Sequence, residues 1–190
     1  YYPGETNMLM ADIAVINKVD TAPPEKVEQV RGNIGRYAAK ATTVLAESSV
    51  LVSQPERISG KRVLVVEDGP TLTHGEMPFG AGLIAAGQHR AAEIIDPRPY
   101  AVGSIIATYA KYPHMGKVLP AMGYGSAQIR DLEQTIANAD CDLVLFATPI
   151  HLPRILNIEK QNLRVRYEYH DHGSPTLEEV LMAKLQGHMR

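Results

Sequence analysis

The chain has 190 residues, 45% of them hydrophobic and 21% charged, which is an ordinary composition for a globular protein with a packed core. A net charge of −2 without any run of Lys or Arg argues against nucleic acid or an acidic membrane surface as the main partner. No apolar stretch is long enough to cross a membrane, and the single cysteine excludes an internal disulfide and any metal site built from several cysteines, so we expect a cytoplasmic protein.

An apolar run over residues 13–16 ends abruptly in the polar sequence Asn-Lys-Val-Asp. This pattern predicts a buried strand that delivers Asn17, Lys18 and Asp20 to the crevice beyond its end, where open α/β sheets bind ligands. The Asp20 carboxylate can accept two hydrogen bonds from guanine that adenine cannot donate, so it would set base specificity. Asn17 can brace the loop, and the Lys18 stem can lie over the ring. The alternative is a chance tetrapeptide in a turn between a strand and a helix.

A helix that begins at Pro23 and Pro24 and a short strand over 42–46 follow this loop. Ser48 comes just after that strand, where the backbone N–H of a small residue can form the far wall of a guanine pocket. The two segments resemble the last two guanine-specificity motifs of P-loop GTPases, although the usual Ala-Lys does not follow Ser48. The phosphate loop of that superfamily occurs nowhere in the chain, so we expect a truncated sequence that lacks the part holding phosphates and magnesium.

Turn-forming residues between Ser53 and Gly60 predict a domain boundary near residue 56, after which the strand pattern restarts at 63–66. Strands are expected over 92–95, 117–122, 142–147 and 163–169, and helices follow them up to a terminal helix begun by Ser174 and Pro175. This alternation predicts an α/β fold with mostly parallel strands, in one or two Rossmann-like three-layer sheets with flanking helices.

Polar side chains follow several predicted strand ends of the second half and should converge on one edge: Asp68, Thr71, Thr73 and His74, then Asp96, Arg98 and Tyr100, then Thr148 and His151. With the backbone N–H groups near Gly80 and Gly82, where a glycine-rich loop enters a helix, they could form a phosphate or oxyanion pocket. The alternatives are close packing of a helix on the sheet for the glycines and a capping role for His74.

Arg98 lies between Pro97 and Pro99, which stiffen the backbone and lower the ordering cost of presenting its guanidinium to a ligand. The alternative is a structural ion pair with Asp68 or Asp96. The sequence His-Asp-His at 170–172 could suggest a metal, but it lacks a third ligand at a suitable spacing. We therefore predict a solvated turn there and no metal site.

Four long segments resemble the C-terminal part of the cyclic 2,3-diphosphoglycerate synthetase family and its P-loop GTPase relatives: residues 2–7, 63–75, 96–104 and 119–125. The resemblance covers essentially the whole chain. It implies a P-loop domain followed by an α/β domain, and an NTP-dependent reaction that closes an intramolecular phosphoanhydride in 2,3-diphosphoglycerate. That reaction consumes ATP, whereas residues 17–20 match a guanine-specificity motif. This member therefore either uses GTP or performs different chemistry on the same fold.

Residues 1–56 would thus be the C-terminal part of a GTPase-like nucleotide domain without its phosphate loop, and residues 57–190 a second α/β domain for the substrate. The intact protein would be a synthetase or a GTPase that uses GTP or ATP with Mg²⁺, whereas this fragment alone would be inactive. The expected roles are base binding by Asn17, Lys18, Asp20 and Ser48, catalysis by His74 and Arg98, and binding of a phosphorylated acceptor by Asp68, Thr71, Thr73 and Tyr100. A GTP-driven switch or metallochaperone-like protein is the alternative, and a homodimer is a further option.

Overall fold

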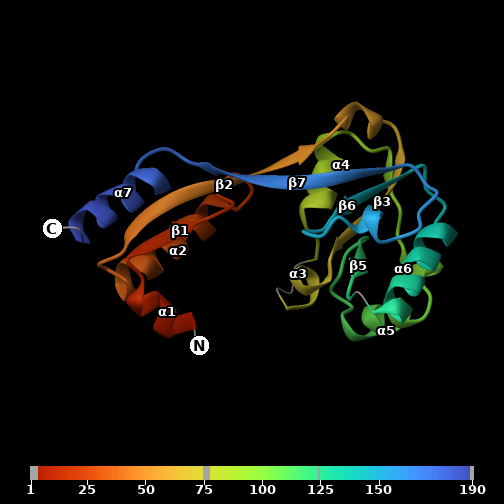
Figure 1. The fold of residues 1–190 in the computed structure, drawn as a ribbon, viewed down its shortest axis with the longest axis horizontal. Coiled ribbons are helices and arrows are strands. Elements are labelled where there is room, and N and C mark those ends of the chain that lie inside the picture. The colour runs from red at the N-terminus through yellow and green to blue at the C-terminus, as the bar shows by residue number, and fades with distance from the viewer. Residues whose placement is uncertain (1–3, 75–77, 124, 189–190) are drawn as a thin grey trace. The chain divides into compact units, whose positions relative to one another are not determined.

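The computed structural model describes residues 4–74, 78–123 and 125–188 (Figure 1). The chain folds into two compact units, of which unit 1 comprises Tyr1–Ser49 with Glu168–Arg190 and unit 2 comprises Val50–Tyr167. Unit 2 is therefore inserted into the sequence of unit 1. No helix in the described ranges is long and apolar enough to cross a membrane.

Unit 1 is built from these elements: α1 (Gly4–Met10), β1 (Ile13–Ile16), α2 (Pro24–Tyr37), the first part of β2 (Thr42–Val52), the end of β7 (Asn162–Asp171) and α7 (Leu177–His188). The strands β1 and β2 pair in parallel, with Ile16 opposite Leu45. Ile16 packs with Ile34 of α2 in a small core. The strand at 13–16 is confirmed, but it is less buried than expected, because only Ile16 is buried and Val15 is 41% exposed.

Unit 2 contains the larger sheet and its helices: η1 (Pro55–Arg57), β3 (Arg62–Asp68), α3 (Gly69–His74), α4 (Ala81–Gln88), β4 (Glu93–Ile94), η2 (Arg98–Tyr100), α5 (Ser104–Lys111), β5 (Leu119–Ala121), α6 (Ser126–Asn138), β6 (Leu143–Ala147) and η3 (Leu152–Arg154). Its strand order is β7-β6-β3-β4, and β5 also pairs with β3. In this unit β3 pairs in parallel with β4, β5 and β6, and β6 pairs in parallel with β7, as expected for strands joined through helices.

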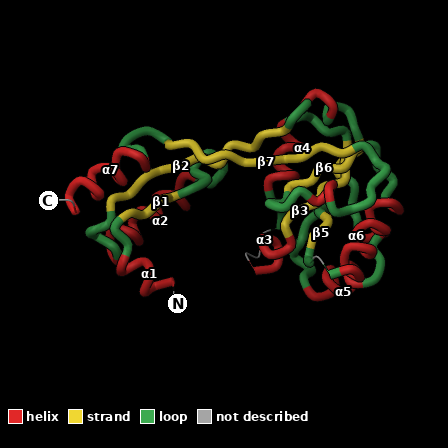
Figure 2. The backbone as a smooth tube through the Cα atoms, viewed as in Figure 1, coloured by secondary structure: helices red, strands yellow, loops and turns green. Residues whose placement is uncertain are grey.

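Alternate residues of β3 point to opposite faces of the sheet, so the strand is covered on both sides. Val63 and Val65 pack with Ala85 and other residues on the α4 face, whereas Leu64 and Val66 pack on the face covered by α5 and α6. Figure 2 shows the backbone of α4 on one side of β3 and that of α5 and α6 on the other. The predicted α/β fold, with mostly parallel strands in a Rossmann-like three-layer arrangement, is confirmed.

The compact units do not follow the predicted division at residue 56. The strand β2 continues beyond the predicted strand over 42–46 as far as Val52, just before the expected linker, and passes into unit 2 at Val50. Residues from Glu168 onward return to unit 1. A restart of the strand pattern shows where a new folding unit begins, but it carries no information on where a later segment packs. The assignment of a nucleotide domain and a substrate domain stays a prediction.

Candidate functional site

The loop that follows β1 folds onto the middle of β2. The backbone N–H of Val19 donates to the Ala46 carbonyl oxygen at 3.1 Å, and the backbone N–H of Ser48 donates to Asp20 Oδ1 at 3.2 Å. The structure therefore brings Asp20 and Ser48 together, as the predicted base pocket requires. The Ser48 N–H was expected to meet the guanine carbonyl, and instead it holds the Asp20 carboxylate.

Within this loop Lys18 has φ +63°, a left-handed conformation that is uncommon outside glycine. The conformation is held locally, because Asn17 Oδ1 accepts the Lys18 N–H at 2.8 Å and the Lys18 carbonyl accepts the Ala22 N–H at 2.9 Å. Asn17, Lys18 and Asp20 are all exposed. The loop thus has a fixed backbone and leaves its three polar side chains open to a ligand.

A second pair of residues lies beside this loop. His172 donates its backbone N–H to the Leu45 carbonyl at 2.9 Å, and its Nδ1 lies 2.6 Å from Glu47 Oε1. The expected solvated turn at 170–172 is therefore wrong in part, because His170 and Asp171 end β7 and His172 is tied to β2. No group of three or more His, Cys, Asp or Glu in the described part of the chain could hold a metal ion.

In unit 2, the guanidinium of Arg98 already has partners within the unit. The strand β4 before it pairs only with Arg62 and Val63, and β5 takes the place beside the end of β3. Arg98 Nη1 lies 3.1 Å from both carboxylate oxygens of Asp96, and Nη2 donates to the Met115 carbonyl. The alternative of an ion pair with Asp96 is thus present in the structure. A catalytic role for Arg98 stays a prediction and would require it to leave these partners.

Tyr100 lies in η2 and packs against the hydrophobic cluster on the α5 and α6 face. Its predicted contact with the acceptor is not tested, but much of its ring surface is used in packing.

Residues 71–74, expected to begin a glycine-rich loop that runs to Gly82, lie instead in the helix α3. Asp68 Oδ2 accepts the Thr71 hydroxyl at 3.0 Å and the Thr71 N–H at 3.4 Å, which is the bonding pattern of a helix N-cap. Thr73 is buried, and its hydroxyl donates to the Gly69 carbonyl at 3.0 Å. These side chains therefore stabilise α3. His74 ends the helix, and its side chain lies outside what the structure describes.

Glu67 is a functional candidate that the sequence reasoning missed. It is the last residue but one of β3, lies on the α4 face and is only 2% exposed. Its Oε1 accepts the backbone N–H groups of Gly80 at 3.2 Å, Gly82 at 2.9 Å and Leu83 at 3.1 Å. Burial raises the pKa of Glu67 to about 7, although these three hydrogen bonds act to lower it.

This arrangement corrects the prediction of a phosphate pocket at the start of α4, because the Glu67 carboxylate already accepts the backbone N–H groups that would bind the phosphate. The same arrangement also explains why positions 80 and 82 are glycine. A Cβ at Gly80 would lie 2.5 Å from Glu67 Oε2, and a Cβ at Gly82 would lie 2.6 Å from Val65 Cγ1. The alternative of close helix packing is confirmed for these positions. The alternation of side chains along β3 could have revealed the role of Glu67 from the sequence, because it places Glu67 on the same face as Val65.

The helix α5 is capped in the same way. Asp131 of α6 accepts the backbone N–H of Ser104 at 2.8 Å and its hydroxyl at 2.7 Å, which lowers the pKa of Asp131. The N-termini of α4 and α5 are therefore both bound by carboxylates from other parts of unit 2.

The loop after β6 carries two further polar residues. Thr148 is buried and donates its hydroxyl to the Ile150 carbonyl at 2.7 Å. Arg164 of β7, which the sequence suggested only as the polar side of a half-exposed strand, donates from Nη2 to the Pro149 carbonyl at 3.0 Å. Among the described residues, His151 Nδ1 and Arg164 Nε are buried without a hydrogen-bond partner.

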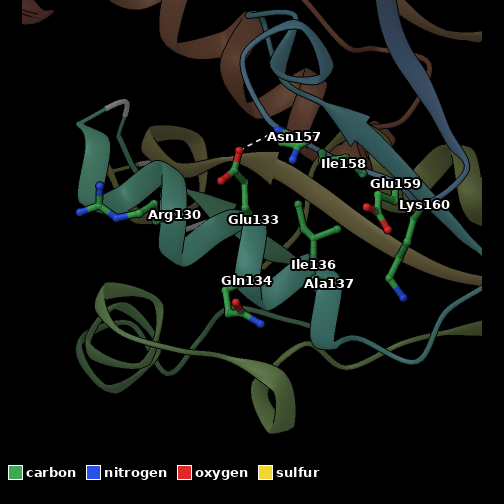
Figure 3. Close-up of a pocket in the computed structure, with 9 residues that line it drawn as sticks. All are labelled: Arg130, Glu133, Gln134, Ile136, Ala137, Asn157, Ile158, Glu159 and Lys160. Atoms are coloured by element: carbon green, nitrogen blue, oxygen red, sulfur yellow. Dashed lines mark hydrogen bonds between the residues drawn. The ribbon is translucent and has the colours of Figure 1, made fainter.

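A groove of about 630 Å³ lies along α6 and the segment before β7. Figure 3 shows it lined by Arg130, Glu133, Gln134, Ile136, Ala137, Asn157, Ile158, Glu159 and Lys160. None of the predicted site residues lines it, and it lies on a helix surface away from the carboxyl ends of the strands. We therefore do not take this groove as the candidate site.

No family model matches the chain. Over 181 residues, or 95% of its length, the chain is 56% identical to a protein named arginine synthetase ArcE from Thermococcus kodakarensis. The matched region is 40% of that relative's length, so the chain spans less than half of it. This similarity links the chain to a synthetase, in agreement with the synthetase part of the resemblance seen in the sequence.

Proposed function

We propose that the chain is part of an NTP-dependent synthetase, in which unit 1 reads the nucleotide base and unit 2 binds a small-molecule acceptor. The observation that carries this proposal is the Asn17 to Asp20 loop, ordered against Ser48 in a chain that is 56% identical to a protein named arginine synthetase.

The base-reading role follows from the geometry of Asp20. One oxygen is held by the Ser48 N–H, which orients the carboxylate while leaving lone pairs for a ligand. Guanine offers two adjacent N–H donors to such a group, and adenine does not. We therefore expect GTP to be preferred over ATP, with Mg²⁺ and the phosphates held by residues outside this chain.

The acceptor is the second element of the proposal. The sequence suggested a phosphorylated metabolite, but Glu67 and Asp131 occupy the helix N-termini that would suit phosphate in unit 2. The relative's name instead points to an amino acid with a carboxylate and a cationic side chain. Asp68 at the end of β3 and Arg164 beside the end of β6 offer the two charge signs that such a molecule needs. We therefore favour an amino-acid acceptor, with positioning of the phosphoryl acceptor as the main contribution of unit 2.

Calorimetry on the intact enzyme with non-hydrolysable analogues of GTP and ATP tests the base assignment. We expect tighter binding of the guanine nucleotide and loss of this preference in Asp20→Asn. Discrimination by a buried, well-paired carboxylate reaches roughly ten-thousand-fold, and an exposed one should give less. Equal affinity for both nucleotides would remove Asp20 from this role.

The reaction class can be tested in reverse: for a synthetase that cleaves NTP to NDP and phosphate, arginine, NDP and phosphate should give NTP together with the precursor of arginine. Formation of NTP that depends on arginine would support the amino-acid acceptor. Cyclisation of 2,3-diphosphoglycerate with NTP, and no reaction with arginine, would restore the phosphorylated acceptor.

A further inference from the structure

We propose that Arg164 and His151 form an oxyanion subsite at the end of β6, which binds the carboxylate or phosphate group of the acceptor. The assignment deepens the proposed synthetase function and rests on it for the identity of the acceptor. The anion chemistry of the subsite can be tested without that identity.

The first observation is the absence of partners. Among the described residues, the buried side-chain nitrogens without a hydrogen-bond partner are His151 Nδ1 and Arg164 Nε. Nearly all buried polar groups in folded proteins are hydrogen-bonded, so each exception needs an explanation such as a bound ligand or water. Here both exceptions come from one corner of unit 2, because Arg164 Nη2 is bonded to the Pro149 carbonyl, two residues before His151.

The second observation is how Arg164 is held. Its neighbours Leu163 and Val165 are buried on the α4 face, so Arg164 points to the other face, in register with Phe146 near the end of β6. The bond to the Pro149 carbonyl fixes one end of the guanidinium without neutralising its charge. Arg164 as a whole is partly exposed, although its Nε is buried.

The charge balance around the subsite favours an anion. Two acids of unit 2 are bonded to helix starts, Glu67 to that of α4 and Asp131 to Ser104, whereas Asp68 is the acid that the proposed function gives to the cationic end of the acceptor. Arg98 differs from Arg164 because Asp96 pairs with it. Arg164 Nε and His151 Nδ1, both without a hydrogen-bond partner, come from the edge where parallel sheets bind ligands. Together they suit a carboxylate or phosphate oxygen.

A direct test is the NMR signal of the Arg164 Nε–H, assigned by its loss in Arg164→Gln. Titration of the intact enzyme with acetate and with inorganic phosphate should shift this signal, and the larger shift identifies the preferred oxyanion. Absence of any shift with either anion would overturn the subsite, whatever the acceptor proves to be.

A second test uses affinity for the acceptor. Calorimetry should show that Arg164→Gln weakens binding of L-arginine or of 2,3-diphosphoglycerate by roughly tenfold to a hundredfold. Agmatine, which is arginine without its carboxylate, should bind the wild-type and Arg164→Gln enzymes equally if the carboxylate is the group recognised. His151→Gln should cause a smaller loss.

The matched control is Arg166→Gln, since Arg166 lies on the same strand, is exposed and forms no ion pair with the described residues. It should leave binding unchanged. Arg164→Lys keeps the charge and should recover part of the affinity, even if Arg164→Gln proves unstable. Wild-type affinity in both Arg164 variants would rule out the subsite. Failure of the wild-type enzyme to bind either acceptor would instead count against the proposed function, and the NMR titration would still decide the subsite.

Discussion

The two units use their polar residues in opposite ways. In unit 1 the side chains of Asn17, Lys18 and Asp20 are exposed on a loop whose backbone is fixed by hydrogen bonds to β2. In unit 2 the equivalent strand-end residues are mostly bonded to other parts of the same unit, as Glu67 is to α4 and Arg98 is to Asp96. The difference shows that polar residues at a strand end are not by themselves a binding site. Their existing partners decide whether they can bind a ligand.

The strongest way to test this comparison is to remove the acid at the start of α4. Glu67→Ala would leave three backbone N–H groups without their acceptor and a cavity beside Val65. We expect a loss of about 3 to 5 kcal/mol in the free energy of unfolding, measured by chemical denaturation. A loss below about 1 kcal/mol would show that Glu67 is not a structural tie and would reopen the start of α4 as an anion site.

The same residue gives a pH dependence with a defined sign. The pKa of Glu67 is raised to about 7 from an ordinary value of 4.5, so between these values the folded protein holds a proton that the unfolded chain releases. Its contribution to stability is fully present below the ordinary pKa and is lost as pH rises through the raised pKa, by about 3 kcal/mol in total. Glu67→Gln cannot ionise, and it should flatten this part of the stability profile. Identical profiles for the two proteins would contradict the assignment.

Several features of the fold could be predicted because they depend on short segments. Alternating strand and helix patterns gave the α/β class, and the loop from Asn17 to Asp20 is held largely by hydrogen bonds between near neighbours. The position of Asp20 and Ser48 at one edge was also expected, since consecutive parallel strands end at the same edge, but the hydrogen bond between them was not.

The errors come from contacts between distant residues. The role of Glu67 depends on glycines in α4, and the cap of α5 depends on Asp131 in α6. The return of β7 to unit 1 depends on pairing with β2, which no local pattern encodes. The sequence also does not show that β4 is short and pairs only with the beginning of β3.

A smaller effect is expected at the second capped helix. Asp131→Ala removes the acceptor for the Ser104 N–H and hydroxyl, and it should lower the thermal midpoint by less than Glu67→Ala does. The pH effect has the opposite sign, because the pKa of Asp131 is lowered in the folded protein. Its contribution is present above the ordinary pKa and is lost as pH falls through the lowered value. Asp131→Asn, which keeps an acceptor oxygen, is the matched control and should be less damaging at neutral pH.

The smallest effect on stability is expected at Arg98, where the result decides whether this residue binds a ligand or forms a structural ion pair. Arg98 and Asp96 have about a third of their side-chain surface exposed, at 38% and 35%, so their ion pair should contribute about 1 kcal/mol or less. If the pair is structural, Arg98→Ala and Asp96→Asn should lower stability by similar small amounts and leave kcat/KM unchanged.

The competing outcome for Arg98 is a kinetic one. If Arg98 leaves Asp96 to bind the acceptor, Arg98→Ala should raise KM and lower kcat by a combined 2 to 5 kcal/mol, about the loss of a desolvated contact with an anionic group. Asp96→Asn should then free the guanidinium and leave kcat/KM intact or improved. Steady-state kinetics of the two variants, compared with their unfolding free energies, separates these cases. Because Arg98 also lies 5.2 Å from the centre of the Tyr109 ring and is bonded to the Met115 carbonyl, we expect the structural outcome.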